Sequence, residues 1–275
     1  MSIMPKVKAN GITLNYEQQG SGEPLILIPY LGADHACYAF QVAEYDKHFT
    51  CFSLDLRGTG ESDKYEGATT TELYADDVAA FMQAVGIERA HVTGLSLGAA
   101  IGMWLAAKYP ERVKSLSLHS GWTRSDTFLK TVLEGWQVFA QALNSAQETM
   151  IRAMFPWCFT AELYATRGDF IQSLADFVRS RPPLSVAGYL QQTNAVLSHN
   201  VESELPKITA PTQITFGRYD QVTSLRYAEP LSAIENSELV VFETCAHAAL
   251  YEAVEEFNQT TLAFLQRHTD RRAAA

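Results

Sequence analysis

The pentapeptide Gly94-Leu95-Ser96-Leu97-Gly98 limits the possible folds of this chain more than any other segment. It lies between an apolar run at 91–93, predicted as a buried strand, and an apolar segment at 97–108, predicted as a helix that ends near Pro110. A serine at a sharp turn from strand to helix has a strained backbone, and small residues two positions before and after it let the chains pass closely. The segment therefore predicts a strand-turn-helix unit that holds the Ser96 hydroxyl above a sheet.

Short apolar runs elsewhere in the chain repeat this pattern of strand and helix. Continuous runs of this kind are typical of parallel strands that are buried on both faces. One helical pattern covers 71–85, with Thr70 or Thr71 as its cap and Gly86 as its stop. The other predicted strands are residues 7–16, 24–29, 49–56, 113–119, 213–216 and 239–242. This alternation predicts an α/β fold with a mostly parallel central sheet that is flanked by helices.

Between residues 122 and 204 the strand patterns stop and helical periodicity dominates. The simplest explanation is a helical insertion, which predicts a core domain of residues 1–121 and 206–275 and a helical cap of residues 122–205. Aromatic side chains are concentrated in this insertion, and binding sites favour domain interfaces. We therefore expect Trp122, Trp136 and Trp157 to bind substrate. A helical domain without a role in binding is the alternative.

Composition argues against several classes of partner. The chain has 275 residues, with 21 Lys and Arg against 31 Asp and Glu, so its net charge is −10. An acidic chain without a Lys/Arg cluster argues against nucleic acid and against anionic membrane surfaces. No stretch approaches the roughly 18 apolar residues of a membrane span, and residues 1–11 lack the apolar core of a signal peptide. We therefore expect a cytoplasmic protein that does not bind membranes.

The sequence contains no pattern that predicts a metal or a cofactor. The cysteines are widely scattered and form no pair at zinc spacing, so we expect reduced thiols; they are Cys37, Cys51, Cys158 and Cys245. No glycine-rich dinucleotide motif or P-loop follows a predicted strand. Neither a metal nor a nucleotide cofactor is expected.

A serine nucleophile needs a base, and the base needs an acid that orients it. Among the seven histidines, His247 differs in position, because it follows the predicted strand 239–242 by a short turn and precedes a predicted helix. Asp220 follows the run 213–216 and so lies at the carboxyl end of a strand, where sheet proteins gather their sites. The sequence thus predicts Ser96, Asp220 and His247 as a catalytic triad.

The sequence resembles the α/β-hydrolases over nearly its whole length, with the insertion as the looser part. Residues 55–62 match the D-x-R-G-x-G-x-S segment of that family, and Ser, Asp and His follow in the family's order. Residues 94–105 and 31–33 are similar to 3-oxoadipate enol-lactonases, whereas residues 120–122 and the insertion are similar to aminoacrylate hydrolases. The resemblance implies an α/β-hydrolase fold with a helical cap and serine hydrolase chemistry.

The resemblance also implies an oxyanion hole made of two backbone N–H groups. By that alignment Leu31 supplies one, and Leu97, directly after the nucleophile, supplies the other. Pro29-Tyr30 stands where many members carry His-Gly. We count Tyr30 among the expected substrate-binding residues, with simple packing as the equal alternative, because buried tyrosines usually use their hydroxyl.

Two other carboxylates compete with Asp220 for the role of triad acid. Glu243 lies beyond the last predicted strand and near His247, and Asp126 follows a strand after which some α/β-hydrolases carry their acid. A further alternative is that Asp220 only forms the turn in which it lies.

The combined features predict a cofactor-free serine hydrolase that cleaves a small carboxylic ester or lactone through an acyl-enzyme. Hydrolysis of a C–C or C–N bond, as in an amide or carbamate, on the same triad is the enzymatic alternative. A non-catalytic ligand receptor on a retained pocket is the other alternative, because a fold does not fix a function. The expected partner is a small-molecule substrate, and the sequence leaves the oligomeric state open, with a homodimer as one possibility.

Overall fold

The computed structural model describes residues 5–65 and 67–270. The strands of this part form one eight-stranded sheet in the order β1 (Lys6–Ala9), β2 (Ile12–Gly20), β4 (Phe49–Leu54), β3 (Glu23–Ile28), β5 (Ala90–Leu95), β6 (Val113–His119), β7 (Thr212–Gly217) and β8 (Ser237–Phe242). The pairs β1–β2 and β2–β4 are antiparallel, and every later pair is parallel. The predicted α/β fold with a mostly parallel sheet is confirmed.

The prediction of a single first strand over residues 7–16 is wrong. Residues 7–16 do not form a single strand, because the chain turns back at Asn10-Gly11 and pairs β1 with β2. Both turn residues have positive φ, 46° at Asn10 and 77° at Gly11. An Asn-Gly pair in this conformation is the preferred two-residue hairpin loop. The hairpin adds an antiparallel edge to the sheet.

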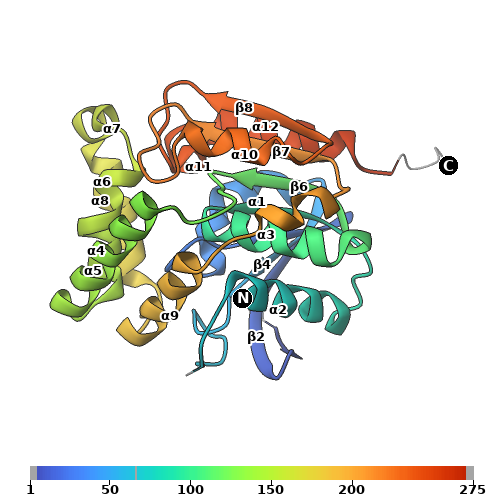
Figure 1. The fold of residues 1–275 in the computed structure, drawn as a ribbon, viewed down its shortest axis with the longest axis horizontal. Helices are drawn as coiled ribbons and strands as arrows, with labels where there is room; N and C mark the ends of the chain where they lie inside the picture. The colour runs from blue at the N-terminus through green and yellow to red at the C-terminus, as the bar shows by residue number, and fades with distance from the viewer. Residues whose placement is uncertain (1–4, 66, 271–275) are drawn as a thin grey trace.

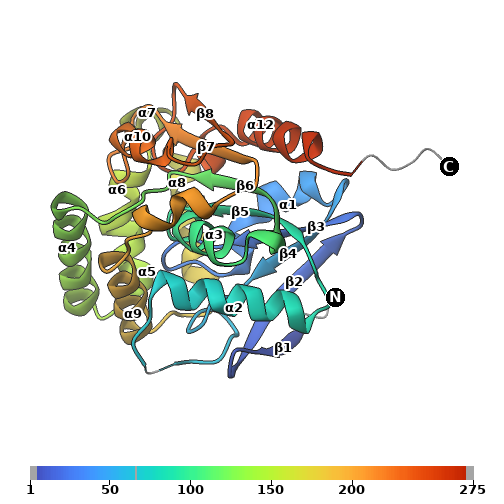
Figure 2. The same ribbon diagram turned by 45° about the vertical axis from the view of Figure 1, so that its right-hand side comes forward.

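Helices cover both faces of the sheet, each over its own apolar cluster (Figures 1 and 2). On one face lie α2 (Thr71–Ala84) and α3 (Leu97–Lys108), and on the other lie α1 (Ala39–Tyr45) and α12 (Val254–Arg267). The Thr70 side chain accepts a hydrogen bond from the Leu73 N–H at 3.0 Å and so caps α2. The helix α3 lies directly after β5, which places Ser96 between the two elements.

The segment between β6 and β7 contains helices, which gather at one end of the sheet (Figure 1). They are α4 (Thr127–Leu143), α5 (Ala146–Thr149), a π-helical turn η3 (Met150–Met154), α6 (Phe155–Cys158), α7 (Ala161–Thr166), α8 (Gly168–Ser180) and α9 (Val186–Leu197). The short η4 (Glu202–Lys207) follows them and packs against α3. We call residues 122–205 the cap. Across the described part of the chain, we find no helix whose length and apolar content suffice for a membrane span.

Candidate active site

Ser96 lies on a strained turn between β5 and α3. Its backbone has φ 55° and ψ −116°, a conformation that L-residues rarely adopt. A Cβ added to Gly94 would collide with the backbone of Gly98, and a Cβ added to Gly98 would collide with the carbonyl oxygen of Ile28 at the end of β3. The two glycines therefore let strand and helix approach closely enough for this turn. The turn leaves Ser96 partly exposed at the wall of a cavity.

His247 and Asp220 come from loops that follow neighbouring strands. Asp220 lies after β7, and His247 lies between β8 and α11 (Ala249–Glu252). The His247 Nδ1 and Asp220 Oδ2 atoms are 2.8 Å apart, and both side chains are buried. A Cβ on Gly217 would collide with the carbonyl oxygen of Ala246, so this glycine allows the two loops to meet.

The surroundings of Asp220 favour its charged form. Its Oδ1 accepts hydrogen bonds from the backbone N–H groups of Val222 at 2.8 Å and Thr223 at 2.9 Å. Burial alone would raise the pKa of Asp220, but the His247 imidazole and these N–H groups hold the pKa below its ordinary value. The carboxylate therefore remains ionised at neutral pH and fixes the imidazole by its Nδ1. This leaves the Nε2 atom for proton transfer.

The Ser96 hydroxyl has no hydrogen-bond partner among the described residues, but Ser96 and His247 line the same cavity. Hydrogen bonds between catalytic groups are often long in structures without substrate and tighten when substrate binds. The structure thus brings a serine on a strained turn and an Asp-oriented histidine to one space.

The two carboxylates that competed with Asp220, those of Glu243 and Asp126, form their ion pairs with other residues. Glu243 is exposed and pairs with Arg218 at 2.6 Å. Asp126 caps α4 through the Leu129 N–H at 2.9 Å and pairs with Arg226 at 3.1 Å. Since neither contacts His247, Asp220 is the carboxylate that the structure joins to the imidazole.

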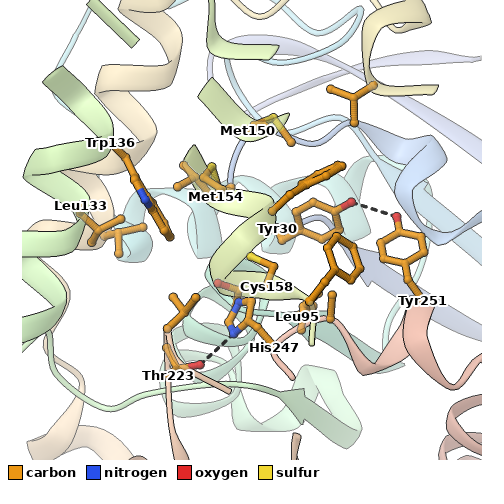
Figure 3. A pocket seen from close by; sticks show the side chains of 18 of the residues that line it. Tyr30, Leu95, Leu133, Trp136, Met150, Met154, Cys158, Thr223, His247 and Tyr251 are labelled. Carbon is orange, nitrogen blue, oxygen red and sulfur yellow. Dashed lines mark hydrogen bonds between the residues drawn. The ribbon is translucent and has the colours of Figure 1, made fainter. Parts of the chain in front are cut away.

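Two hydroxyl side chains that sequence reasoning missed support the histidine loop. Ser120 follows β6 with φ 49°, and its Oγ donates to the backbone oxygen of His247 at 3.1 Å. The Thr223 Oγ1 atom lies 2.8 Å from the Ser120 backbone oxygen and 3.2 Å from His247 Nδ1 (Figure 3). Isolated serines and threonines carry no sequence signal for such a role.

Glu252 ties the histidine loop to the cap. Its carboxylate accepts hydrogen bonds from the Ala246 N–H and from the backbone N–H and hydroxyl of Thr160, the latter two at 2.7 and 2.8 Å. The position of Glu252, five residues after His247, gave no hint of these contacts. The loop that carries His247 is therefore fixed from the sheet side and from the cap side.

The two predicted oxyanion donors come from two segments, the turn after β3 and the start of α3. Leu31 lines the cavity, and Leu97 is the first residue of α3. Among the described residues, neither backbone N–H has a hydrogen-bond acceptor. The turn after β3 is closed by a hydrogen bond of 3.1 Å from the Ala33 N–H to the Tyr30 carbonyl.

The cavity lies between the carboxyl end of the sheet and the cap (Figure 3). None of the described residues that line it is Asp, Glu, Lys or Arg. Many of the lining side chains were missed, because apolar residues in cap helices have the same sequence pattern as core residues. The missed lining residues of the cap are Leu129, Leu133, Met150, Met154, Phe155, Cys158, Phe159, Leu174, Phe177, Val178 and Val196, and those outside the cap are Leu95, Val222, Thr223, Ala248 and Tyr251.

Three of the four aromatic residues predicted to bind substrate line this cavity. They are Tyr30, Trp122 and Trp136. In Figure 3, Trp136 stands on the side of the cavity opposite Tyr30 and Tyr251. The Tyr30 hydroxyl lies 2.9 Å from that of Tyr251, so Tyr30 both lines the cavity and packs through its hydroxyl.

The placement expected for Trp157 is not what the structure shows. Trp157 lines a separate, open groove on the outside of the cap, together with Phe128 and Phe139. The helix α6 makes a single turn, in which Phe155 and Cys158 share the face toward the cavity. Residues at i and i+3 lie on one side of a helix, so the intervening Trp157 points away.

One cluster carries side chains of the kinds that bind metals, namely Asp34, His35 and Asp55. Its polar atoms serve in hydrogen bonds. His35 Nδ1 lies 2.8 Å from Asp55 Oδ1, and Asp34 pairs with Arg181 at 2.8 Å. Asp55 also accepts from the Glu61 N–H at 2.8 Å. This network fixes residues 55–62, and we assign the cluster a structural role.

Comparison with known proteins gives consistent results. The family model described as alpha/beta hydrolase fold matches residues 23–254. A putative carbamate hydrolase RutD of Azorhizobium caulinodans is 28% identical over 95% of this chain and 98% of its own length. A 3-oxoadipate enol-lactonase of Acinetobacter baylyi is 26% identical over 93% of this chain and 94% of its own. The crystal structure of the enol-lactonase from Burkholderia xenovorans superposes with a TM-score of 0.86 at 26% identity, over 95% of this chain and 100% of the other.

Proposed function

Because this chain belongs to the alpha/beta hydrolase family of hydrolytic enzymes, we propose that it cleaves a small, uncharged carboxylic ester or lactone with Ser96, His247 and Asp220. One observation carries the proposal. His247, whose Nδ1 lies 2.8 Å from Asp220 Oδ2, lines the same cavity as Ser96 on its strained turn. This is the arrangement that acyl transfer through a serine requires.

In the proposed reaction the Ser96 Oγ attacks the acyl carbon, and His247 takes the hydroxyl proton through Nε2. The backbone N–H groups of Leu31 and Leu97 hold the negative charge that develops on the carbonyl oxygen. The protonated imidazole, stabilised by Asp220, then gives its proton to the leaving alcohol. Water, deprotonated by His247, attacks the acyl-enzyme, and the carboxylic acid leaves as Ser96 recovers its proton.

The cavity wall supports an uncharged substrate. A substrate carboxylate that loses its water needs a paired cation, because an unpaired buried charge is very costly. Within residues 5–65 and 67–270, no Lys or Arg side chain lines the cavity, whereas aliphatic, aromatic and thioether groups surround it. An ester or lactone offers a polar carbonyl at the reacting atom and apolar surface elsewhere.

The names of the relatives cover a lactone and a carbamate, so the type of bond that this protein cleaves needs a direct test. The purified protein is assayed with p-nitrophenyl acetate and butyrate, a neutral lactone, an anilide, a carbamate and a β-diketone, beside Ser96→Ala as the control. We expect turnover of the ester and lactone and a loss of about 10⁶-fold in kcat in Ser96→Ala, because a triad works as a unit.

A fluorophosphonate probe should label Ser96 alone. Labelling of another serine, or activity retained in Ser96→Ala, would contradict the proposed nucleophile. Turnover restricted to the carbamate or to the β-diketone would contradict the proposed substrate class while leaving the triad intact.

A further inference from the structure

A single hydrogen bond joins the cap to the turn that carries one of the proposed oxyanion donors. The Gly32 backbone N–H donates to the Gln192 Oε1 atom at 2.8 Å, across 160 positions of the sequence. Gln192 lies in α9 and is 1% exposed. Gly32 directly follows Leu31, whose N–H we place at the substrate oxygen.

The hydrogen bond from Gly32 to Gln192 is made by the central peptide group of the turn formed by residues 30–33. Tyr30 and Ala33 close the turn, and Gly32 has φ 82°. A positive φ at the third position is typical of a type II turn, whose central peptide here joins Leu31 to Gly32. That peptide can rotate in a turn of this kind, and the bond to Gln192 fixes its orientation. The Leu31 N–H belongs to the preceding Tyr30–Leu31 peptide, whose orientation is coupled to the fixed peptide through the backbone dihedral angles of Leu31. A Cβ on Gly32 would meet the Met150 Sδ atom, so the cap also covers this peptide closely.

The helix that carries Gln192 is itself anchored. The Thr69 hydroxyl donates to the Gln191 carbonyl at 2.7 Å, which ties α9 to the core. Within the cap, Gln137 Nε2 donates to Thr193 Oγ1 at 2.8 Å. Just beyond the end of α9, His199 Nδ1 lies 2.8 Å from the Thr71 hydroxyl. The Gln192 oxygen is therefore held at a fixed place relative to the sheet.

We infer that Gln192 is a positioning residue, which holds the Leu31–Gly32 turn so that the Leu31 N–H points at the developing oxyanion. The inference rests on the proposed function. Within residues 5–65 and 67–270 the Gln192 Nε2 atom has no hydrogen-bond partner, so the polar role of this side chain is to accept from Gly32. Gln192 touches neither Ser96 nor His247 by a hydrogen bond, and it acts on the reaction only through the turn.

The test uses the full chain and p-nitrophenyl butyrate. Gln192→Met keeps the length of the side chain and removes the amide oxygen, and Gln192→Glu keeps an acceptor. We expect kcat to fall by about 10- to 100-fold in Gln192→Met with KM within about threefold, because small displacements of an oxyanion donor act on the transition state. Gln192→Glu should recover kcat to within about threefold of the parent. Gln213→Met, which changes another buried glutamine away from the cavity, is the matched control and should leave kcat unchanged.

Each kcat is calculated per active site, and the active sites are counted by labelling with a fluorophosphonate to completion. A loss of folded protein is then not mistaken for a fall in kcat. If Gln192→Met does not fold, Gln192→Asn, whose shorter amide cannot reach Gly32, takes its place. The same fall in kcat with KM nearly unchanged is expected for it. A kcat within twofold of the parent, or a rise in KM with unchanged kcat, would overturn the positioning role. Activity retained in Ser96→Ala would instead overturn the proposed function, so the two failures are distinct.

Discussion

Two serines near the proposed reacting atoms hold backbone conformations that serine rarely adopts. The φ angles are 55° at Ser96 and 49° at Ser120, and each strained residue costs about 1–3 kcal/mol. Hydrogen bonds hold both, from the Ser96 N–H to the His119 carbonyl at 2.9 Å and from the Ser120 N–H to the Thr215 carbonyl at 2.8 Å. The strain turns one hydroxyl toward the cavity and the other toward the His247 backbone.

At the residue scale, Asp220→Asn should lower kcat by about 10⁴-fold while KM changes little. An amide fills the same space, but it favours the wrong imidazole tautomer and cannot stabilise the imidazolium. Steady-state kinetics on p-nitrophenyl butyrate measures the change. Asp126→Asn and Glu243→Gln are the matched controls and should keep near-full activity. A loss confined to Asp126→Asn would show that the acid has been misassigned.

Side chains at strand ends could be predicted from the sequence, and side chains that act at a distance could not. Ser96, Asp220 and His247 each follow an apolar run, and parallel strands bring their carboxyl ends to one edge. Ser120 contacts His247 across 127 positions and Gln192 contacts Gly32 across 160. No local sequence pattern predicts such a contact, because the contact depends on how the cap packs against the sheet.

At the element scale, Trp136 ends the cavity on the side of the cap helix α4. Its side chain is 5% exposed and lines both the cavity and the outer groove. Trp136→Leu should raise kcat/KM for octanoyl relative to acetyl esters by about tenfold, because removal of the indole lengthens the apolar space and each buried CH₂ contributes about 0.8 kcal/mol. A series of p-nitrophenyl esters from acetate to octanoate measures this.

Trp157→Leu is the matched control for this change, since Trp157 lines the outer groove and is not among the described residues that line the cavity. It should leave the chain-length profile unchanged. An equal shift in both variants, or none in Trp136→Leu, would contradict the assignment of Trp136 to the end of the acyl site.

The elements themselves were predictable to differing degrees. The helix at 97–108 has the predicted bounds, because an apolar run followed by Pro110 marks both ends. The split between β1 and β2 was missed, although Asn10-Gly11 is a recognised hairpin signal. The inward and outward faces of α6 could not be predicted, since four residues are too few to show a period.

At the scale of the whole molecule, stability should fall as the pH drops below about 6.5, the ordinary pKa of histidine. Burial lowers the pKa of His119 to about 3 and that of His199 to about 4. Both stay neutral in the folded state while the unfolded chain takes up protons. The free energy of unfolding therefore decreases by up to about 1.4 kcal/mol per pH unit for each histidine.

Below about pH 4, Asp55 and Asp220 add to the loss of stability. Their pKa values are lowered in the folded state, so protonation of these carboxylates stabilises the unfolded state.

Urea unfolding between pH 8 and pH 5 measures this slope. His119→Gln should flatten it, whatever its effect on stability at pH 8, because it removes one of the buried histidines that are protonated only after unfolding. A slope equal to that of the parent would contradict the assignment.

The chain leaves the core and returns to it at nearly one point, where Arg124 and Asn200 form an antiparallel bridge and the Val201 N–H donates to the Thr123 carbonyl at 2.8 Å. An insert whose two ends are adjacent can be exchanged for one of another length without separating the strands on either side. The cap is therefore a natural unit for grafting between enzymes of this architecture. A transplanted cap would need to bring its own acceptor for the Gly32 N–H and its own partner for Glu252, and a graft chosen on cavity shape alone would lack both.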